Sequence, residues 1–149
     1  MSEKAAVDPR YTDEETIRSI ISTARTIAVV GLSPKPDRPS NEVAAYLQRH
    51  GYRIIPVNPA ETEILGERCY ASLSEIPEHV DVVDVFRKPE AVPPIAEEAG
   101  KIGAGALWLQ LDIISPEAAK VAEDGGLKVV MDRCIKVEHE RLSASGAVR

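Results

Sequence analysis

A short apolar segment that ends in a glycine and leads into a helix constrains the fold of this chain more than any other feature. Residues 27–31 are Ile-Ala-Val-Val-Gly, and the loop after them carries Lys35 and Arg38. A helical pattern then opens at Asn41, and Ser40 is expected to cap it. Amide groups at a helix start are unpaired and lie at the positive end of the helix dipole. The segment therefore predicts a strand, a turn and a helix N-terminus that hold a phosphate group, such as a nucleotide carries.

Length and composition fit one folded domain. A chain of 149 residues, 44% of them hydrophobic, builds one buried core and has no room for a second. The first residues contain no apolar segment after their charges, and no later apolar run approaches the roughly 18 residues of a membrane helix. We therefore expect a single-domain cytoplasmic protein with no membrane partner.

Charge and residue type disfavour several partners. The chain has 24 acidic and 18 basic residues and only 4% aromatic residues. These values disfavour the basic surface and the stacking platform of a nucleic-acid-binding protein. Two cysteines, Cys69 and Cys134, are too few for a disulfide framework, and no Cys or His cluster has metal-site spacing. We expect neither a nucleic-acid partner nor a metal ion.

The hydrophobic pattern alternates between strands and helices. The predicted helices span residues 12–24, 41–50, 89–102 and the segment from Ser115 to the Gly125-Gly126 pair. The predicted strands span residues 27–30, 53–57, 81–86, 106–109 and 128–131, with a short edge strand at 67–70. Helices of this length between strands imply right-handed crossovers. The expected fold class is α/β: a doubly wound, mainly parallel Rossmann-like sheet with helices on both faces, in a single domain.

Both ends of the chain are expected to lie outside this domain, which we place at residues 12–142. Residues 1–11 are predicted to form a flexible N-terminus. The segment after Cys134 is charged and carries Ser-Ala-Ser-Gly close to its end. We therefore expect disorder after Cys134, with residues 143–149 as a disordered tail.

Polar and cationic residues follow the ends of the predicted strands. In doubly wound sheets the ligand lies beyond the carboxyl ends of the strands, where the strand order reverses. The residues at these ends are Gly31, Ser33, Lys35, Arg38, Asn58, Arg87, Lys88, Gln110, Asp132 and Arg133. Five of them are cations, and their convergence on one edge of an acidic molecule predicts an anion site. The alternative is that each cation only solvates its own turn.

The loop after the first strand differs from the fingerprint of NAD-binding proteins. Of the G-x-G-x-x-G pattern only Gly31 is present. The second strand ends in Asn58, where an NAD-binding domain places an acidic residue for the ribose hydroxyls. Lys35 and Arg38 instead suit a ligand with an additional phosphate, because charge-assisted hydrogen bonds are strong and arginine binds phosphate in a fork. Coenzyme A (CoA) and NADP both satisfy this condition.

Six motifs, in order along the chain, resemble those of a known family. They are Gly31-Leu-Ser-Pro-Lys-Pro-Asp-Arg-Pro-Ser40, Ile55-Pro-Val-Asn-Pro59, Ile64-Leu-Gly-Glu67 with the following Tyr70, Val82-Val-Asp-Val-Phe-Arg87, Leu107-Trp-Leu-Gln110 and Val130-Met-Asp-Arg-Cys134. Over residues 15–142 the chain resembles the small stand-alone CoA-binding domain proteins, and it is similar to the nucleotide-binding domain of the succinyl-CoA synthetase alpha chain. The resemblance implies a Rossmann-like sheet that binds CoA with its ADP part across the strand ends.

The resemblance also implies which residues hold the cofactor. The phosphates would be held by Gly31, Ser33, Lys35, Arg38 and Ser40. The nucleotide and the upper pantetheine arm would lie near Val57, Asn58, Phe86 and Arg87. The candidate cofactor-binding set is completed by Pro39, Lys88, Gln110 and Arg133. Two acidic residues depart from the family: Asp112 stands where glycine is usual after the Trp-Leu-Gln-Leu run, and Glu42 replaces a more usual residue just inside the helix. Both would add negative charge near the site.

Residues for a catalytic reaction are harder to find. His50, His79 and His139 lack the neighbours of a catalytic triad and are expected at the surface. Trp108 is expected in the core rather than as a ligand platform. Cys134 is expected to be half-buried and without a chemical role; the alternative is a mixed disulfide with the thiol of the coenzyme. We expect no turnover from the isolated protein.

Three functions from different classes stay open. The leading one is a non-catalytic protein that binds CoA or an acyl-CoA as a carrier, a sensor or the accessory protein of another enzyme. The second is a small NADP-dependent oxidoreductase, which needs a substrate pocket and a proton donor that the sequence does not show. The third is an interaction module with a vestigial nucleotide site, of which Asp112 and Glu42 would be signs. Titration with CoA, NADP and NAD separates the three.

Overall fold

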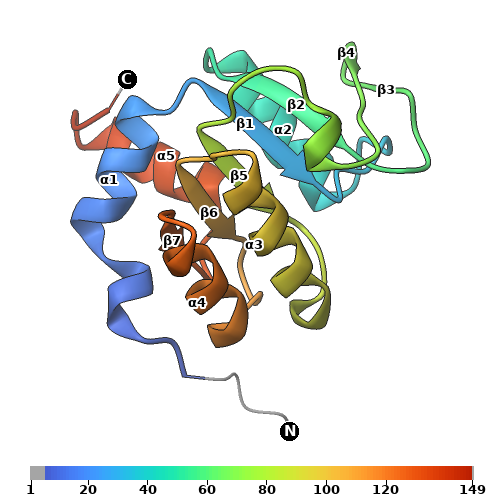
Figure 1. The fold of residues 1–149 in the computed structure, drawn as a ribbon. Helices are drawn as coiled ribbons and strands as arrows, with labels where there is room; N and C mark the ends of the chain where they lie inside the picture. Colours follow the sequence, from blue (N-terminus) through green and yellow to red (C-terminus); the bar gives the residue numbers. More distant parts are fainter. Residues whose placement is uncertain (1–5, 149) are drawn as a thin grey trace, which may run out of the picture.

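The computed structural model describes residues 6–148, which alternate between strands and helices (Figure 1). The strands are β1 (Thr26–Val30), β2 (Arg53–Val57), β3 (Glu63–Ile64), β4 (Glu67–Arg68), β5 (Val82–Val85), β6 (Ala106–Leu109) and β7 (Lys128–Val130). The α-helices are α1 (Glu14–Thr23), α2 (Pro39–Arg49), α3 (Val92–Lys101), α4 (Pro116–Asp124) and α5 (Ile135–Ala144). Short 3₁₀ turns are η1 (Pro9–Thr12), η2 (Leu73–Glu75) and η3 (Pro89–Ala91). No described helix is long and apolar enough to cross a membrane.

Five strands form one parallel sheet in the order β2-β1-β5-β6-β7. Val30, at the end of β1, is paired with Val57 on one side and with Val85 on the other. In this sheet β2 lies on one side of β1, and β5, β6 and β7 lie on the other side. The strand order therefore reverses between β1 and β5, which is the switch point of a doubly wound sheet. The predicted fold class is confirmed.

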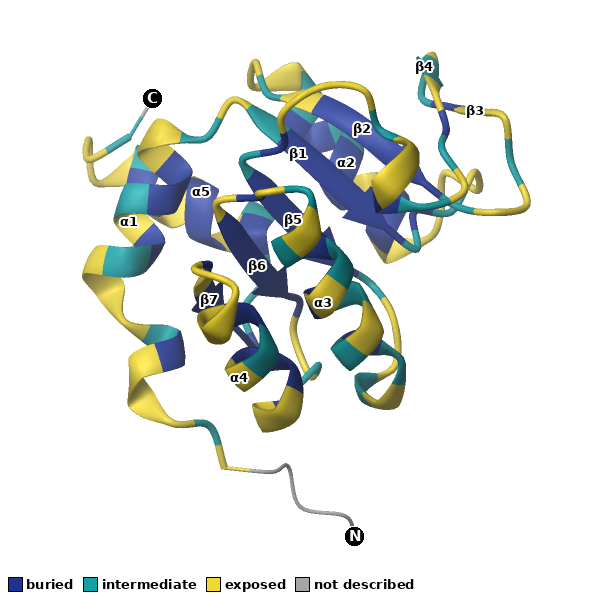
Figure 2. Cartoon of the chain, viewed as in Figure 1, coloured by how far each residue is buried: buried dark blue, intermediate teal, exposed yellow. Residues whose placement is uncertain are grey.

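Helices cover both faces of this sheet. Val83 and Val85 point to the face covered by α3 and α4, whereas Val82 points to the face covered by α1, α2 and α5. Figure 2 shows the strands of the five-stranded sheet largely buried and the outer sides of the helices exposed. Trp108 is fully buried, as predicted, and its Nε1 donates to the carbonyl oxygen of Arg133 at 2.8 Å. Two apolar layers, one on each face, make the core.

Side chains set the starts of the helices. The Asp13 carboxylate caps α1, and the Ser115 hydroxyl caps α4 by accepting a hydrogen bond from the amide of Ala118 at 3.1 Å. The Ser115 cap was predicted. In contrast, α2 begins at Pro39, where the missing amide of proline costs nothing. Ser40 therefore lies inside the first turn, and the prediction that it caps this helix is wrong.

The segment after β2 forms a hairpin of its own. The predicted edge strand at 67–70 is reduced to β4, which pairs with β3 outside the main sheet. Leu65 and Gly66 at the tip have φ values of 55° and 77°, typical of the tight turn that pairs adjacent residues. Tyr70, which follows β4, forms a single parallel bridge to Val57 of β2.

Both chain ends differ from expectation. Tyr11 lies in η1 and is buried, so the predicted flexible segment 1–11 does not hold for its last residues; residues 1–5 lie outside the described part. After Cys134 the chain forms α5, which buries Ile135, His139 and Leu142. The predictions of disorder after Cys134 and of a surface position for His139 are therefore wrong. The other predicted surface histidines, His50 and His79, are exposed.

Proline also changes one helix. The predicted helix at 89–102 divides into η3 and α3. Pro93 and Pro94 fall in the first turn of α3 and donate no backbone hydrogen bonds to the turn before them. The α-helix therefore starts at Val92 rather than at Pro89.

Candidate functional site

A pocket of about 420 Å³ opens at the carboxyl ends of β1 and β5. Gly31 directly follows β1, and Phe86 directly follows β5. The pocket therefore lies at the switch point, where doubly wound sheets bind their ligands. The residues that line it are Gly31, Ser33, Lys35, Arg38, Pro39, Ser40 and Phe86. All of them belong to the predicted cofactor-binding set, so the fold brings together residues as far apart in the chain as Gly31 and Phe86.

Hydrogen bonds fix the loop between β1 and α2. The Ser40 hydroxyl accepts from the amide of Ser33 at 3.0 Å, and the Asn41 side chain donates to the carbonyl oxygen of Ser33 at 2.9 Å. The Ser33 hydroxyl in turn accepts from the amide of Lys35 at 3.1 Å. Ser40 thus ties the loop to the helix instead of capping the helix. These hydrogen bonds restrain the loop without a ligand, and restraint before binding lowers the entropic cost of binding.

Gly31 allows the end of β5 to approach the loop closely. Its φ is +85°, and a Cβ added to it would lie 2.5 Å from the carbonyl oxygen of Phe86 and 3.0 Å from Cδ of Arg87. Any larger residue would be strained by its backbone and would collide with the next strand. Because Gly31 has no side chain, the Arg87 side chain can lie beside the turn that follows β1.

Cations lie on the segments that follow β1 and β5, and two of them, Lys35 and Arg38, line the pocket. None of the acidic residues that the structure describes forms a salt bridge with the four cations at the β1 and β5 ends, Lys35, Arg38, Arg87 and Lys88. All four are exposed. The N-terminus of α2, with its positive end of the helix dipole, opens on the same loop. The arrangement suits a ligand with several phosphate groups.

The other predicted residues have structural contacts. Val57 is buried, and its carbonyl oxygen accepts from the amide of Gly31 at 3.0 Å. The Asn58 side chain donates to the carbonyl oxygen of Leu32 at 3.0 Å and accepts from the amide of Ala60 at 2.9 Å. Both residues shape the floor of the loop. Whether they also contact a ligand stays a prediction.

Gln110 and Arg133 lie outside the pocket, at the ends of β6 and β7. Gln110 is buried, and its Oε1 accepts from the amide of Ile135 at 3.2 Å, which fixes the start of α5. Nη1 of Arg133 donates to the carbonyl oxygen of Asp132 at 2.8 Å. These two residues could meet only a ligand that extends along the strand ends.

Comparison with known proteins decides the family. The model of the family described as CoA binding domain matches residues 25–140. The chain belongs to this family. It is 44% identical over 123 residues to the uncharacterized protein YneT of Bacillus subtilis, covering 83% of this chain and 91% of that protein. The resemblance inferred from the sequence motifs is therefore confirmed.

Two further relatives of this CoA-binding domain show how far the similarity extends. The chain is 31% identical over 121 residues to an ADP-forming acetate–CoA ligase of Archaeoglobus fulgidus, covering 74% of this chain but only 18% of the ligase. A solved structure of a hypothetical protein from Pyrococcus horikoshii superposes with a TM-score of 0.86 at 43% identity, covering 96% of this chain and 99% of that one. The fold thus occurs both alone and as a small part of a larger enzyme.

The two acidic residues that differ from the family pattern, Glu42 and Asp112, lie in different parts of this CoA-binding domain. Glu42 is exposed on the first turn of α2. Asp112 is exposed after β6 with a φ of +69°, and its amide donates to Oδ1 of Asp132 at 2.8 Å. A left-handed φ is the conformation that glycine adopts most easily and that aspartate tolerates. Asp112 therefore has a backbone conformation that a glycine at this position would also adopt.

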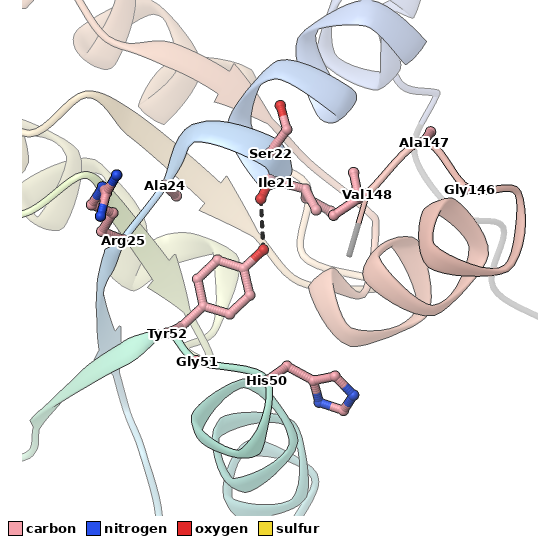
Figure 3. A pocket seen from close by; sticks show the side chains of 10 residues that line it. All are labelled: Ile21, Ser22, Ala24, Arg25, His50, Gly51, Tyr52, Gly146, Ala147 and Val148. Carbon is pink, nitrogen blue, oxygen red and sulfur yellow. Dashed lines mark hydrogen bonds between the residues drawn. The ribbon is translucent and has the colours of Figure 1, made fainter.

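A second pocket, of about 440 Å³, lies at the opposite end of the sheet (Figure 3). It is lined by Ile21, Ser22, Ala24, Arg25, His50, Gly51, Tyr52, Gly146, Ala147 and Val148. The Tyr52 hydroxyl donates to the carbonyl oxygen of Ile21 at 2.6 Å. The C-terminal ends of α1, α2 and α5 meet here, and their negative dipole ends disfavour phosphate. No sequence pattern predicted this pocket, because its walls come from segments far apart in the chain.

Neither cysteine forms a disulfide. Cys69 is buried, and burial raises the pKa of its thiol, so it is a structural residue. Cys134 is half-buried at the start of α5. Among residues 6–148, no three His, Cys, Asp or Glu side chains are grouped so that they could hold a metal ion.

Proposed function

We propose that this CoA-binding domain binds CoA, or an acyl-CoA, in the pocket between β1 and β5 and acts as a non-catalytic carrier, sensor or accessory protein. One observation carries the proposal: Lys35 and Arg38 line a pocket at the switch point of the sheet, beside the N-terminus of α2. CoA has a pyrophosphate and a third phosphate on its ribose. Two sets of cations, one after each strand, give these groups separate partners.

The ligase similarity supports binding rather than ligation. A segment like this chain occupies 18% of a protein named for joining acetate to CoA. The segment that the ligase shares with this chain is small. Recognition of CoA is a function that both proteins would need, and we assign it to this shared segment. The ligation step would then require residues from the remainder of the ligase, outside the aligned region.

The proposal is tested by calorimetric titration of the full chain with CoA, NADP and NAD. We expect saturable binding of CoA and no comparable binding of NAD, because the loop lacks the dinucleotide fingerprint and Asn58 replaces the acidic ribose ligand. Preferential binding of NADP would instead favour an oxidoreductase. Binding of none of the three would favour an interaction module with a vestigial site.

Replacing Arg38 with alanine is expected to weaken CoA binding by about 1.5 to 3 kcal/mol, the range for a hydrogen bond to a charged group, or about ten- to 150-fold in Kd. The matched control is Arg25→Ala, which removes an exposed arginine at the opposite pocket. Its effect on CoA affinity should be small. Equal effects of the two substitutions in the same titration would remove Arg38 from the site.

A further inference from the structure

The β3–β4 hairpin has little structure of its own to keep it closed. It contains two paired positions, Glu63 with Arg68 and Ile64 with Glu67, and it lies outside the five-stranded sheet (Figure 1). Of residues 63–68, only Ile64 is buried. An isolated two-stranded hairpin is marginally stable, and weakly held segments open locally at a low cost in free energy. Contacts with the rest of the molecule therefore decide how often this hairpin is closed.

Asn58 connects the base of the hairpin to the loop between β1 and α2, residues 31–38, which we call the phosphate loop. Its Nδ2 donates to the carbonyl oxygen of Leu32 at 3.0 Å, and its Oδ1 accepts from the amide of Ala60 at 2.9 Å. The backbone amide of Asn58 donates to the carbonyl oxygen of Tyr70 at 2.9 Å. An amide side chain can donate and accept at the same time. Asn58 therefore holds both ends of the hairpin segment and the phosphate loop together.

A second contact connects the tip of the hairpin to α2. Nε2 of Gln48 donates to the carbonyl oxygen of Leu65 at 3.1 Å. The first turn of the same helix is bonded to the phosphate loop, because the side chains of Ser40 and Asn41 both form hydrogen bonds with the backbone of Ser33. The hairpin is thus tied at its base to the phosphate loop and at its tip to α2. Both of these elements border the candidate CoA pocket.

Building on the proposed function, we propose that Asn58 is a positioning residue that couples the β3–β4 hairpin to the phosphate loop, so that bound CoA keeps the hairpin closed. Opening of the hairpin releases Asn58 from Tyr70 and Ala60. The Asn58 side chain then no longer fixes the carbonyl oxygen of Leu32, and ordering the phosphate loop costs part of the binding free energy. Because coupling between two sites is reciprocal, CoA favours the closed hairpin by the factor by which opening weakens CoA binding. The hairpin is the surface that changes with occupancy, as the sensor form of the proposed function requires.

Amide hydrogen exchange of the full chain, with and without saturating CoA, measures the closed state of the hairpin. The amide of Cys69 donates to the carbonyl oxygen of Thr62 at 2.9 Å across the hairpin, so its exchange reports opening. We expect this exchange to slow about two- to 30-fold when CoA is bound, the range for coupling between sites. The comparison amide is that of Gly126, which donates to the carbonyl oxygen of Glu123 at 2.9 Å in the turn after α4. Its exchange should not change.

Gln48→Ala tests the coupling from the far end of the hairpin. Gln48 does not line the pocket, and alanine is a better helix former than glutamine, so α2 itself is not weakened. We expect CoA binding to weaken about two- to fivefold and the Cys69 amide to exchange faster by a similar factor. Asn58→Ala, which removes the contact at the base, should weaken CoA binding about five- to 30-fold.

The control is Arg49→Ala, which changes the exposed next residue of α2 and leaves the contact between Gln48 and Leu65 in place. Arg49 lies about 15 Å from the start of α2, beyond the Debye length of about 8 Å at physiological salt, so CoA affinity should stay within about twofold. If CoA binds without slowing exchange of the Cys69 amide, or binds equally to Gln48→Ala and Arg49→Ala, the inference is wrong and the proposed function stands. If CoA itself does not bind, the proposed function fails and the inference fails with it.

Discussion

Replacing Asp84 with valine is expected to raise the free energy of unfolding at neutral pH by about 1 to 3 kcal/mol, the cost of a buried polar group without a partner. Asp84 lies in β5 between Val29 and Trp108 and is completely buried. Neither of its carboxylate oxygens has a hydrogen-bond partner among the described residues. Valine removes both oxygens and suits a buried strand.

The same residue should make stability depend on pH. Burial raises the pKa of Asp84 well above its usual range, whereas in the unfolded chain the pKa is about 3.9. The folded state then keeps a proton that the unfolded state loses. Stability from this group is therefore complete below about pH 4 and is lost as the pH rises through the folded pKa. Asp84→Asn cannot ionise, so its advantage over the unaltered chain should grow from about pH 4 upward.

Urea unfolding of the unaltered chain, Asp84→Val and Asp84→Asn at several pH values measures both effects. Asp81→Ala is the control of opposite sign, because the Asp81 carboxylate accepts hydrogen bonds from the amides of Arg25 and Thr26 at 2.8 and 3.0 Å. It should destabilise the fold. If the Asp84→Val protein is less stable than the unaltered chain at neutral pH, the Asp84 carboxylate must have a stabilising partner, and this prediction is wrong.

Replacing Gly31 with alanine is expected to lower the free energy of unfolding by about 2 to 5 kcal/mol. About 1 to 2 kcal/mol comes from the left-handed backbone, and about 1 to 3 kcal/mol comes from displacing the end of β5. The new Cβ would lie 2.5 Å from the carbonyl oxygen of Phe86, which cannot move without disturbing the strand. CoA affinity should fall as well, because Gly31 and Phe86 both line the pocket.

Gly126→Ala separates the two contributions. Gly126 has a φ of +87°, close to that of Gly31, but an added Cβ would meet no atom within 4 Å. Its substitution should cost only the backbone part, about 1 to 2 kcal/mol, and should not affect CoA binding. Equal losses for the two substitutions in thermal or urea unfolding would show that the contact with Phe86 carries no energy.

The strands and most helices were predictable because apolar runs and turn residues mark them directly. The positions 53–57 and 106–109 agree with β2 and β6, since each run is bounded by polar or turn residues. Gly31 follows β1 and Phe86 follows β5, and a doubly wound sheet brings the carboxyl ends of these two strands together at the switch point. This is why the lining of the pocket could be anticipated from the sequence.

The failures have local causes. Ser40 is not the cap of α2, because Pro39 occupies the first helical position and the helix therefore starts two residues earlier than predicted. The many charged residues of α5 are the reason that no helix was predicted there. Ile135, His139 and Leu142 have the i, i+4, i+7 spacing that is typical of a buried helix face. The partner of buried Gln110 lies 25 residues away, so no local pattern announces that contact.

Amide NMR of the isotope-labelled chain during CoA titration tests the location of the site most directly. The account predicts shifts for amides of residues 31–41 and 86–88, which surround the pocket between β1 and β5. It predicts little change for residues 21–25, 50–52 and 146–148 around the opposite pocket (Figure 3). Shifts confined to that opposite pocket, or no shifts anywhere in the titration, would contradict it.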